Sequence, residues 1–361
     1  MAGSKRPPPT TPERDLIHYF TGHNLDIPLP HPLPETTDPL VTTLRGSRVT
    51  KISAYLKRRQ FFLKDLSHPQ DYDTPSDLSK GKGFPPTGFT SADLIHFQVQ
   101  HAKSAGPPHH LNARYLAPAL ASLTFPLHFL DFETAQPAVP LTPSQRPYET
   151  IPFQFSHHVL HEDGRLEHGE FIEMTGEDPT AAFAEALAEA LGNGAGSVVH
   201  WGAYERTILN KLGAFDGHNV FERLVDLSVF VKKGWYGGGM KGSNSLKHVL
   251  QSAVNESDAL RRIYCEEYDG SNFDKFVWWR EGPDGAVVDP YMLLATDEGV
   301  TDGAGAAAAY LAVRRGEMDE GEGADMLKMY CELDTLGMVM VYQALVGFVE
   351  QEQQGEVELE Q

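Results

Sequence analysis

Two acidic residues, Asp131 and Glu133, stand one residue apart at the end of an apolar run, residues 127–132. The run predicts a buried strand, on which side chains two positions apart point to the same face. Two carboxylates held together near a core cost several kcal/mol unless a cation compensates their charge. A divalent metal ion would supply that compensation, so the pair is a candidate metal site unless the strand ends at Phe132 and both acids reach solvent.

Two further clusters offer groups that suit the same chemistry. Glu205 falls in the first turn of a predicted helix, residues 204–212, that follows another short apolar run. Tyr330 and Asp334 lie four positions apart on a long predicted helix, which brings their Cβ atoms to about 5–6 Å. Hard divalent cations take oxygen ligands, and displacement at phosphorus uses two such ions about 3.5–4 Å apart. The four carboxylates therefore predict a site for two Mg²⁺ or Mn²⁺ ions.

Three more residues are candidates for a supporting role. Asp226 follows an apolar stretch and is either a carboxylate that supports the site or a loop or helix-capping residue. Ser243 to Lys247 open a predicted helix whose free backbone N–H groups could bind a phosphate, with Lys247 nearby, although plain helix capping explains the pattern as well. His157, His158, His161 and His200 follow no catalytic or zinc-binding order and are expected to be structural.

The elements that must position these side chains follow from apolar periodicity and turn residues. Predicted strands cover residues 127–132, 151–161, 166–174, 197–201 and 224–230, and predicted helices cover residues 180–191, 204–212, 243–252 and 323–351. Three consecutive strands followed by alternating helices and strands predict an α/β fold with a mixed sheet flanked by helices, the order expected of an RNase H-like fold.

Proline and charge divide the chain into unlike parts. Residues 1–126 hold 17 of the 25 prolines and carry 14 Lys and Arg against 10 Asp and Glu, whereas the remaining residues carry 16 against 40. We expect residues 1–104 to be a Pro-rich, poorly structured lead-in region with short helices. Residues 105–350 should form the α/β domain with an irregular insertion at 253–303, and residues 351–361 a disordered acidic tail.

Composition narrows the class of function. The acidic body of a chain with net charge −20 argues against a protein that grips a long duplex through phosphate contacts, so a local site must do any nucleic-acid chemistry. A basic stretch, residues 51–64 with Tyr55, Phe61 and Phe62, suits phosphate and base contacts or is a solvated helix face.

Two cysteines without zinc-binding spacing are expected to stay reduced. No apolar run approaches the roughly 18 residues of a membrane span and no signal peptide is visible, so a cytoplasmic protein without a membrane partner is expected.

The three clusters resemble the exonuclease motifs of the DEDD superfamily, whose fold is RNase H-like. The matching residues are Asp131-Phe132-Glu133, Tyr204-Glu205, and Tyr330 with Asp334. Tyr330 stands four positions before the aspartate, and Met329 occupies the position of the histidine in the other subtype, so the resemblance is to the DEDDy type. It implies that Asp131, Glu133 and Asp334 hold metals and that Tyr330 orients the attacking water. The chain departs from the superfamily pattern at two positions. It has Glu205 where the superfamily usually has aspartate, and Trp201 where the superfamily commonly has asparagine.

Longer phrases between these motifs are similar to an uncharacterised bacterial family described as a domain of unknown function, commonly joined to RecB-like or Cas4-like nuclease modules. They are Arg146-Pro147-Tyr148, Ile151 to Ser156, Arg223 to Leu227, and Gly242 to Lys247. The resemblance covers about residues 105–347.

Together these resemblances imply a metal-dependent 3'-to-5' exonuclease that hydrolyses single-stranded DNA or RNA ends, with a nuclease or a repair or defence protein as a further partner. Glu205, Trp201 and the acidic body also suit a non-catalytic nucleic-acid-binding or regulatory subunit that keeps the fold. An endonuclease of the same fold is a third hypothesis. The intact acids of the first and third motifs favour the enzyme.

Overall fold

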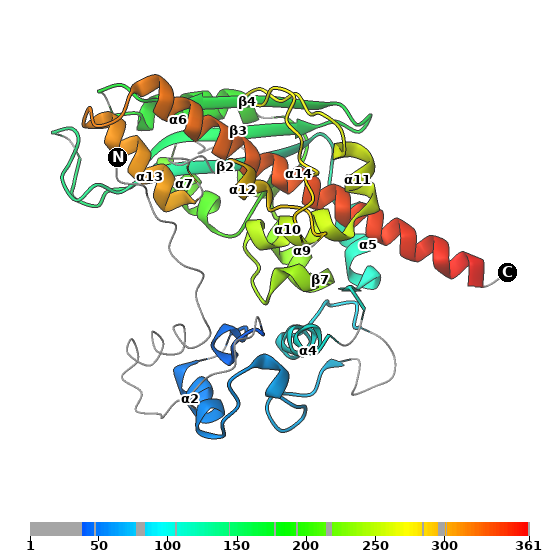
Figure 1. The fold of residues 1–361 in the computed structure, drawn as a ribbon. Helices are drawn as coiled ribbons and strands as arrows, with labels where there is room; N and C mark the ends of the chain where they lie inside the picture. The colour runs from blue at the N-terminus through cyan, green and yellow to red at the C-terminus, as the bar shows by residue number, and fades with distance from the viewer. Residues whose placement is uncertain are drawn as a thin grey trace.

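A five-stranded sheet in the order β4-β3-β2-β5-β6 forms the centre of the protein. The computed structural model describes residues 38–359, apart from 47, 77–83, 105–106, 144, 177, 193, 214–218, 284, 295–299 and 301, and only the backbone of residues 356–359. The strands are β2 (Leu127–Ala135), β3 (Ile151–Leu160), β4 (Leu166–Ile172), β5 (Val198–His200) and β6 (Leu224–Asp226). β2, β3 and β4 are antiparallel neighbours, whereas β5 runs parallel to β2, and β6 runs parallel to β5. The predicted α/β fold with a mixed sheet is confirmed (Figure 1).

Helices cover both faces of this sheet. One face packs against α6 (Thr180–Leu191) and α7 (Tyr204–Leu212), through a cluster that includes Leu130 and Phe132 of β2. The other face packs against α13 (Gly303–Arg314) and the 40-residue α14 (Glu320–Leu359). Figure 1 shows α14, coloured orange to red, crossing the sheet. The sheet is therefore the middle of three layers.

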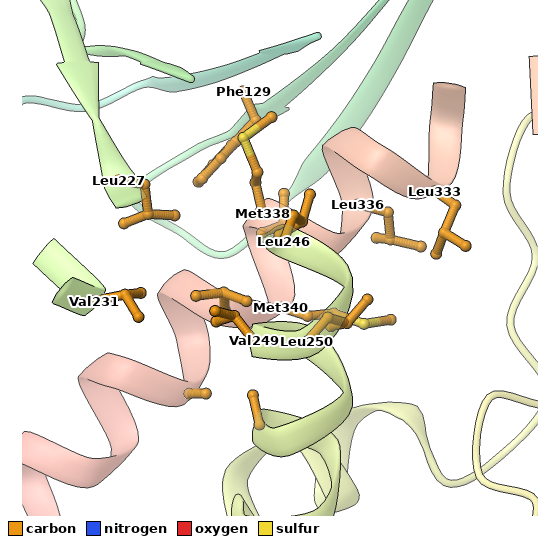
Figure 2. Close-up of a cluster of buried hydrophobic side chains, with 14 of the residues drawn as sticks. Phe129, Leu227, Val231, Leu246, Val249, Leu250, Leu333, Leu336, Met338 and Met340 are labelled. Atoms are coloured by element: carbon orange, nitrogen blue, oxygen red, sulfur yellow. The ribbon is translucent and has the colours of Figure 1, made fainter. Parts of the chain in front are cut away.

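A smaller layer packs against α14 beside the sheet. It contains the antiparallel pair β1 (His109–Leu111) and β7 (Trp235–Gly237), packed with α5 (Ala113–Ala121), α9 (Leu227–Gly234), η3 (Gly238–Met240), α10 (Leu246–Glu256), α11 (Asp258–Tyr264) and α12 (Pro290–Leu294). The short α8 (Val220–Arg223) instead packs Val220 into the cluster with α6 and α7. Figure 2 shows apolar side chains of α9 and α10 interlocking with those of α14 and with Phe129 of β2. Gly337 permits the close approach, because a Cβ there would lie 3.1 Å from Leu250 Cδ2. This contact fixes α10, and with it Lys247, against α14.

Residues 38–104 have a hydrophobic cluster of their own, built around η1 (Val41–Thr43), α2 (Val49–Lys57), η2 (Leu63–Asp65) and α4 (Ser91–Ala102). Tyr55, Phe61 and Phe62, which were candidates for base stacking, are buried in this cluster. They cannot stack on a nucleobase without unfolding this cluster, so of the two alternatives for the basic stretch the one with base contacts is excluded for these three rings. The remainder of the predicted lead-in, residues 1–37, lies outside the described residues.

Several elements differ from their predicted bounds. The stretch 224–230 is not one strand, because the Asp226 carboxylate accepts the Ser228 N–H and starts α9 directly after β6. The insertion 253–303 is not irregular throughout, since it contains the end of α10, all of α11 and α12 and the start of α13. α14 continues to Leu359, so residues 351–359 are helical where a disordered tail was expected.

α14 also corrects the expectation about apolar runs. Among the described residues, its stretch Glu320–Gly355 is long and apolar enough to cross a membrane by length and composition. Most of that stretch is buried inside the protein, as in the core helix of a soluble protein.

Candidate metal centre

Five predicted site residues meet at one edge of the sheet. A cavity of about 450 Å³ is lined by Asp131 and Glu133 from β2, Glu205 from α7, and Tyr330 and Asp334 from α14. Because β2 and β5 are parallel, their carboxyl ends point to the same edge, and α7 begins there directly after β5. This edge is where open α/β sheets usually place their ligands.

The geometry of β2 turns both of its acids toward α14. Phe132, between them in sequence, belongs to the cluster on the opposite face, as the two-residue alternation of a strand requires. β2 runs on to Ala135, so neither acid lies beyond the strand end. The pairing with β3 shifts between Glu133 and Thr134, and such bulges re-aim side chains next to active sites. Ligand atoms of Asp131, Glu133 and Cys331 lie within 4.8 Å of one another.

Burial and mutual repulsion raise the pKa values of the acids. Burial first, and then the carboxylates of Asp334, Glu205 and Glu133, raises the pKa of Asp131 well above its usual value. Burial and Asp334 do the same to the pKa of Glu133. Burial raises the pKa of Asp334 to about 6, although hydrogen bonds from two tyrosines and the charge of Lys247 oppose the rise. A divalent cation would remove the repulsion and stabilise all of these carboxylates in their charged form.

Glu205 offers a free acceptor to such a cation. It stands in the first turn of α7, where the helix dipole favours a negative charge. Its Oε2 lies 3.5 Å from His200 Nδ1, with the two side chains 5% and 4% exposed. Within the described part of the chain this oxygen accepts no hydrogen bond. A buried carboxylate oxygen without a donor is costly, and a bound metal ion would satisfy it.

Two residues of the smaller layer complete the site. The Tyr291 hydroxyl of α12 donates a hydrogen bond to Asp334 Oδ1. Lys247 Nζ of α10 lies 4.9 Å from the ring centre of Tyr291 and 5.2 Å from that of Tyr330, within cation–π range. Its charge opposes the rise in the pKa of Glu133 as well as that of Asp334. Lys247 is thus held above two rings and beside the acids.

The other supporting candidates lie apart from the acids. Asp226 Oδ1 accepts hydrogen bonds from the backbone N–H groups of Gly202 (2.9 Å) and Ser228 (3.0 Å), so it caps α9 and ties down the loop before α7. Ser243 Oγ lies 3.2 Å from both N and Oγ of Ser245, in the turn before α10. Of the three supporting candidates, Lys247 is the one whose charge acts on the carboxylates.

The donor set suits a hard metal. Burial raises the pKa of the Cys331 thiol well above its usual value, as do Asp131 and Glu133, so the sulfur stays protonated and is a poor ligand. The remaining donors are carboxylate oxygens, which bind Mg²⁺ and Mn²⁺ in preference to thiophilic metals. The residues present therefore fit the ions that the sequence predicted.

A second cluster of ligand atoms comes from His158, His168 and Glu332, and hydrogen bonds engage Glu332 and His158. The Glu332 carboxylate accepts from the backbone N–H groups of Ser271 (3.0 Å) and Asn272 (2.8 Å) and from the Asn272 side chain (2.8 Å). His158 Nδ1 lies 2.7 Å from the hydroxyl of Thr335. This network fastens α14 to the sheet, in agreement with the structural role expected for His158.

Sequence reasoning missed Tyr291, and it assigned His200 to structure only. Tyr291 follows Asp289-Pro290, and proline at the first position of a helix was a usable signal for the start of α12. Nothing local indicated that this helix would meet Asp334, 43 positions away. His200 is the last residue of β5, and its proximity to Glu205 follows from the tight turn between β5 and α7.

Comparison with known proteins agrees with part of the resemblance. The model of the family "Domain of unknown function (DUF2779)" matches residues 128–245. That segment contains β2 to β7, the first two acidic motifs and Asp226, and it supports the similarity to an uncharacterised family. No curated protein and no solved structure gives a significant match to the chain.

Proposed function

We propose that this chain is a divalent-metal-dependent phosphodiesterase of the 3'-to-5' exonuclease type that acts on single-stranded nucleic-acid ends. The observation that carries the proposal is the convergence of Asp131, Glu133, Glu205 and Asp334 on one cavity. Tyr330 in the same cavity supports a DEDDy-type site. The meander β2-β3-β4 followed by β5 and β6 parallel to β2 supports an RNase H-like fold.

The acids hold metal ions in this proposal. Asp131, Glu133 and Asp334 would be the ligands, and Glu205 would complete the set directly or through water. When bound, two Mg²⁺ or Mn²⁺ ions would supply an activated water and stabilise the negative charge that develops at phosphorus. Tyr291 would fix the rotamer of Asp334, and His200 would lie beside the Glu205 carboxylate without a hydrogen bond to it.

Two side chains would act on the substrate itself. Burial and three neighbouring acids raise the pKa of Tyr330, so its hydroxyl keeps its proton at neutral pH and orients the attacking water without deprotonating it. Lys247 would donate to a phosphate oxygen, since it is the cation already held beside the acids. The contact between α10 and α14 fixes the positions of Lys247 and Tyr330 on which these two roles depend.

End-labelled single-stranded DNA and RNA oligonucleotides test the proposal. With Mn²⁺ the wild type should give a stepwise ladder of products shortened from the 3' end, and EDTA should stop it. Asp131→Asn and Glu133→Gln each remove a metal ligand at nearly constant volume, so we expect folded but inactive proteins. Tyr330→Phe keeps the ring and deletes the hydroxyl, which should slow the reaction roughly 10²- to 10⁴-fold.

Each alternative gives its own result in this assay. An internal cut would favour the endonuclease. No cleavage of either nucleic acid by the wild type would favour the non-catalytic subunit. Cleavage that persists in Asp131→Asn would show that this residue holds no catalytic metal.

A further inference from the structure

A second hollow lies next to the metal centre. It has a volume of about 550 Å³, in the range of sites that hold a small organic molecule or a nucleotide. It is lined by the loop between β2 and β3, the start of α6 and the end of α7, including Arg146, Tyr148, Thr150 and Lys211. Neither the proposed reaction nor the acidic motifs use these residues.

Tyr148, on this loop, combines an exposed aromatic ring with a left-handed backbone conformation. Its side chain is 69% exposed although it is aromatic, and its backbone has φ = +60°, a left-handed conformation that costs a non-glycine residue of order 1 kcal/mol or more. Hydrogen bonds hold it there: the Tyr148 N–H donates to Pro137 O (2.9 Å), and the Glu149 N–H donates to Arg146 O (3.1 Å). The ring is thus presented to solvent by a fixed turn.

The hollow is linked to the metal centre by hydrogen bonds. Thr150 Oγ1 accepts from Lys211 Nζ (3.2 Å) and from Gln136 Nε2 (3.2 Å), and Gln136 also lines the cavity of the acids. α7 spans the same interval, with Glu205 in its first turn and Lys211 in its last. Six residues of helix correspond to about 9 Å. The two hollows are therefore close enough to hold neighbouring nucleotides of one strand.

The second hollow has no excess of positive charge that would by itself attract a nucleic-acid strand. The cations Arg146 and Lys211 are matched by Glu149 and Asp178, and both acids accept backbone N–H groups, from Arg146 (2.7 Å) and Thr180 (3.0 Å) respectively. The feature that distinguishes it is the exposed ring. An exposed aromatic side chain beside a groove is the group that stacks on bases in sequence-tolerant binding of single strands.

We propose that this hollow is a nucleotide subsite, in which Tyr148 stacks on a base of the single strand whose end lies at the metal centre. The proposal rests on the proposed function for the nature of its ligand. Lys211 and Arg146 contact the adjoining phosphates, and the fixed turn keeps the ring ready to stack.

Binding without cleavage tests this subsite. Fluorescence anisotropy with a labelled single-stranded 10-mer is measured in EDTA, in the Asp131→Asn background. Adding Tyr148→Ala should weaken binding roughly 5- to 150-fold, the range that corresponds to about 1–3 kcal/mol of stacking free energy per base. Tyr148→Phe should bind as the parent does, because it keeps the ring. Val139→Ala, on the same loop at 77% exposure and outside the hollow, is the matched control.

The outcomes separate this proposal from the proposed function. Unchanged binding by Tyr148→Ala, an equal loss in Val139→Ala, or a parent that does not bind the strand would overturn the subsite. Cleavage by the wild type is scored independently in the ladder assay. An inactive wild type whose binding still depends on Tyr148 would contradict the nuclease and retain the subsite.

Discussion

At the scale of single residues, Asp334 is an acid of the cavity with polar neighbours from three helices, α10, α12 and α14. It accepts the Tyr291 hydroxyl, contacts Tyr330 and faces Lys247, and these groups favour its charged form against the effect of burial. Partners of this kind typically contribute 10- to 100-fold to metal affinity or activity.

We therefore expect Tyr291→Phe to weaken Mn²⁺ binding roughly 10- to 100-fold, because the ring stays and the donor is lost. Titration calorimetry measures this directly. Tyr264→Phe is the matched control, since its buried hydroxyl also donates to α14, to Gln343 Oε1 at 3.0 Å, outside the cavity. Equal effects of the two variants would mean that Tyr291 contributes to packing only.

At the scale of elements, three predicted segments carry the acids and all three formed where they were expected. β2, α7 and α14 could be predicted because apolar periodicity and helix signals are local. α13 was not predicted, since Gly303–Arg314 is rich in alanine and glycine and shows no contrast between a polar and an apolar face. The position of Tyr291 could not be predicted because it depends on long-range packing of α12 against α14.

The choice between Glu205 and Asp226 is also a question about elements. Glu205 begins α7 inside the cavity, whereas Asp226 caps α9 outside it. Glu205→Asp should keep measurable activity and Glu205→Ala should lose it. Asp226→Ala should cost about 1 kcal/mol of stability through the lost cap and keep Mn²⁺ binding. An inactive Asp226→Ala beside an active Glu205→Ala would reverse the assignment.

At the scale of the whole molecule, the amino-terminal part and the part that holds the carboxylates are joined at the loop before α10. Arg45 Nη1 donates to Gly242 O (3.0 Å), and Gln98 Nε2 donates to Lys241 O (3.1 Å). These bonds fix the loop that leads into the helix of Lys247. Residues 38–104 therefore support the site, which their proline content alone did not indicate.

Burial of the Asp334 carboxyl group makes the stability of the whole protein depend on pH. An unfolded aspartate loses its proton near pH 4, whereas folded Asp334 keeps its proton up to about pH 6. Between these values the folded state binds more protons than the unfolded state, so stability falls as pH rises. In EDTA, the melting temperature of the wild type relative to Asp334→Asn should fall by several degrees from pH 4 to pH 7. Parallel curves for the two proteins would contradict this.

The Mn²⁺ dependence of thermal unfolding tests the central claim, that these carboxylates form one metal site, most directly. Metal that binds only the folded state stabilises it by RT ln(1 + [L]/Kd), about 2.7 kcal/mol at a hundredfold excess over Kd. At pH 7.5 we expect Mn²⁺ to raise the melting temperature of the wild type by several degrees, EDTA to reverse the rise, and Asp131→Asn to abolish most of it. An equal rise in wild type and Asp131→Asn would mean that Mn²⁺ acts on the acidic surface and that the four carboxylates do not form a metal site.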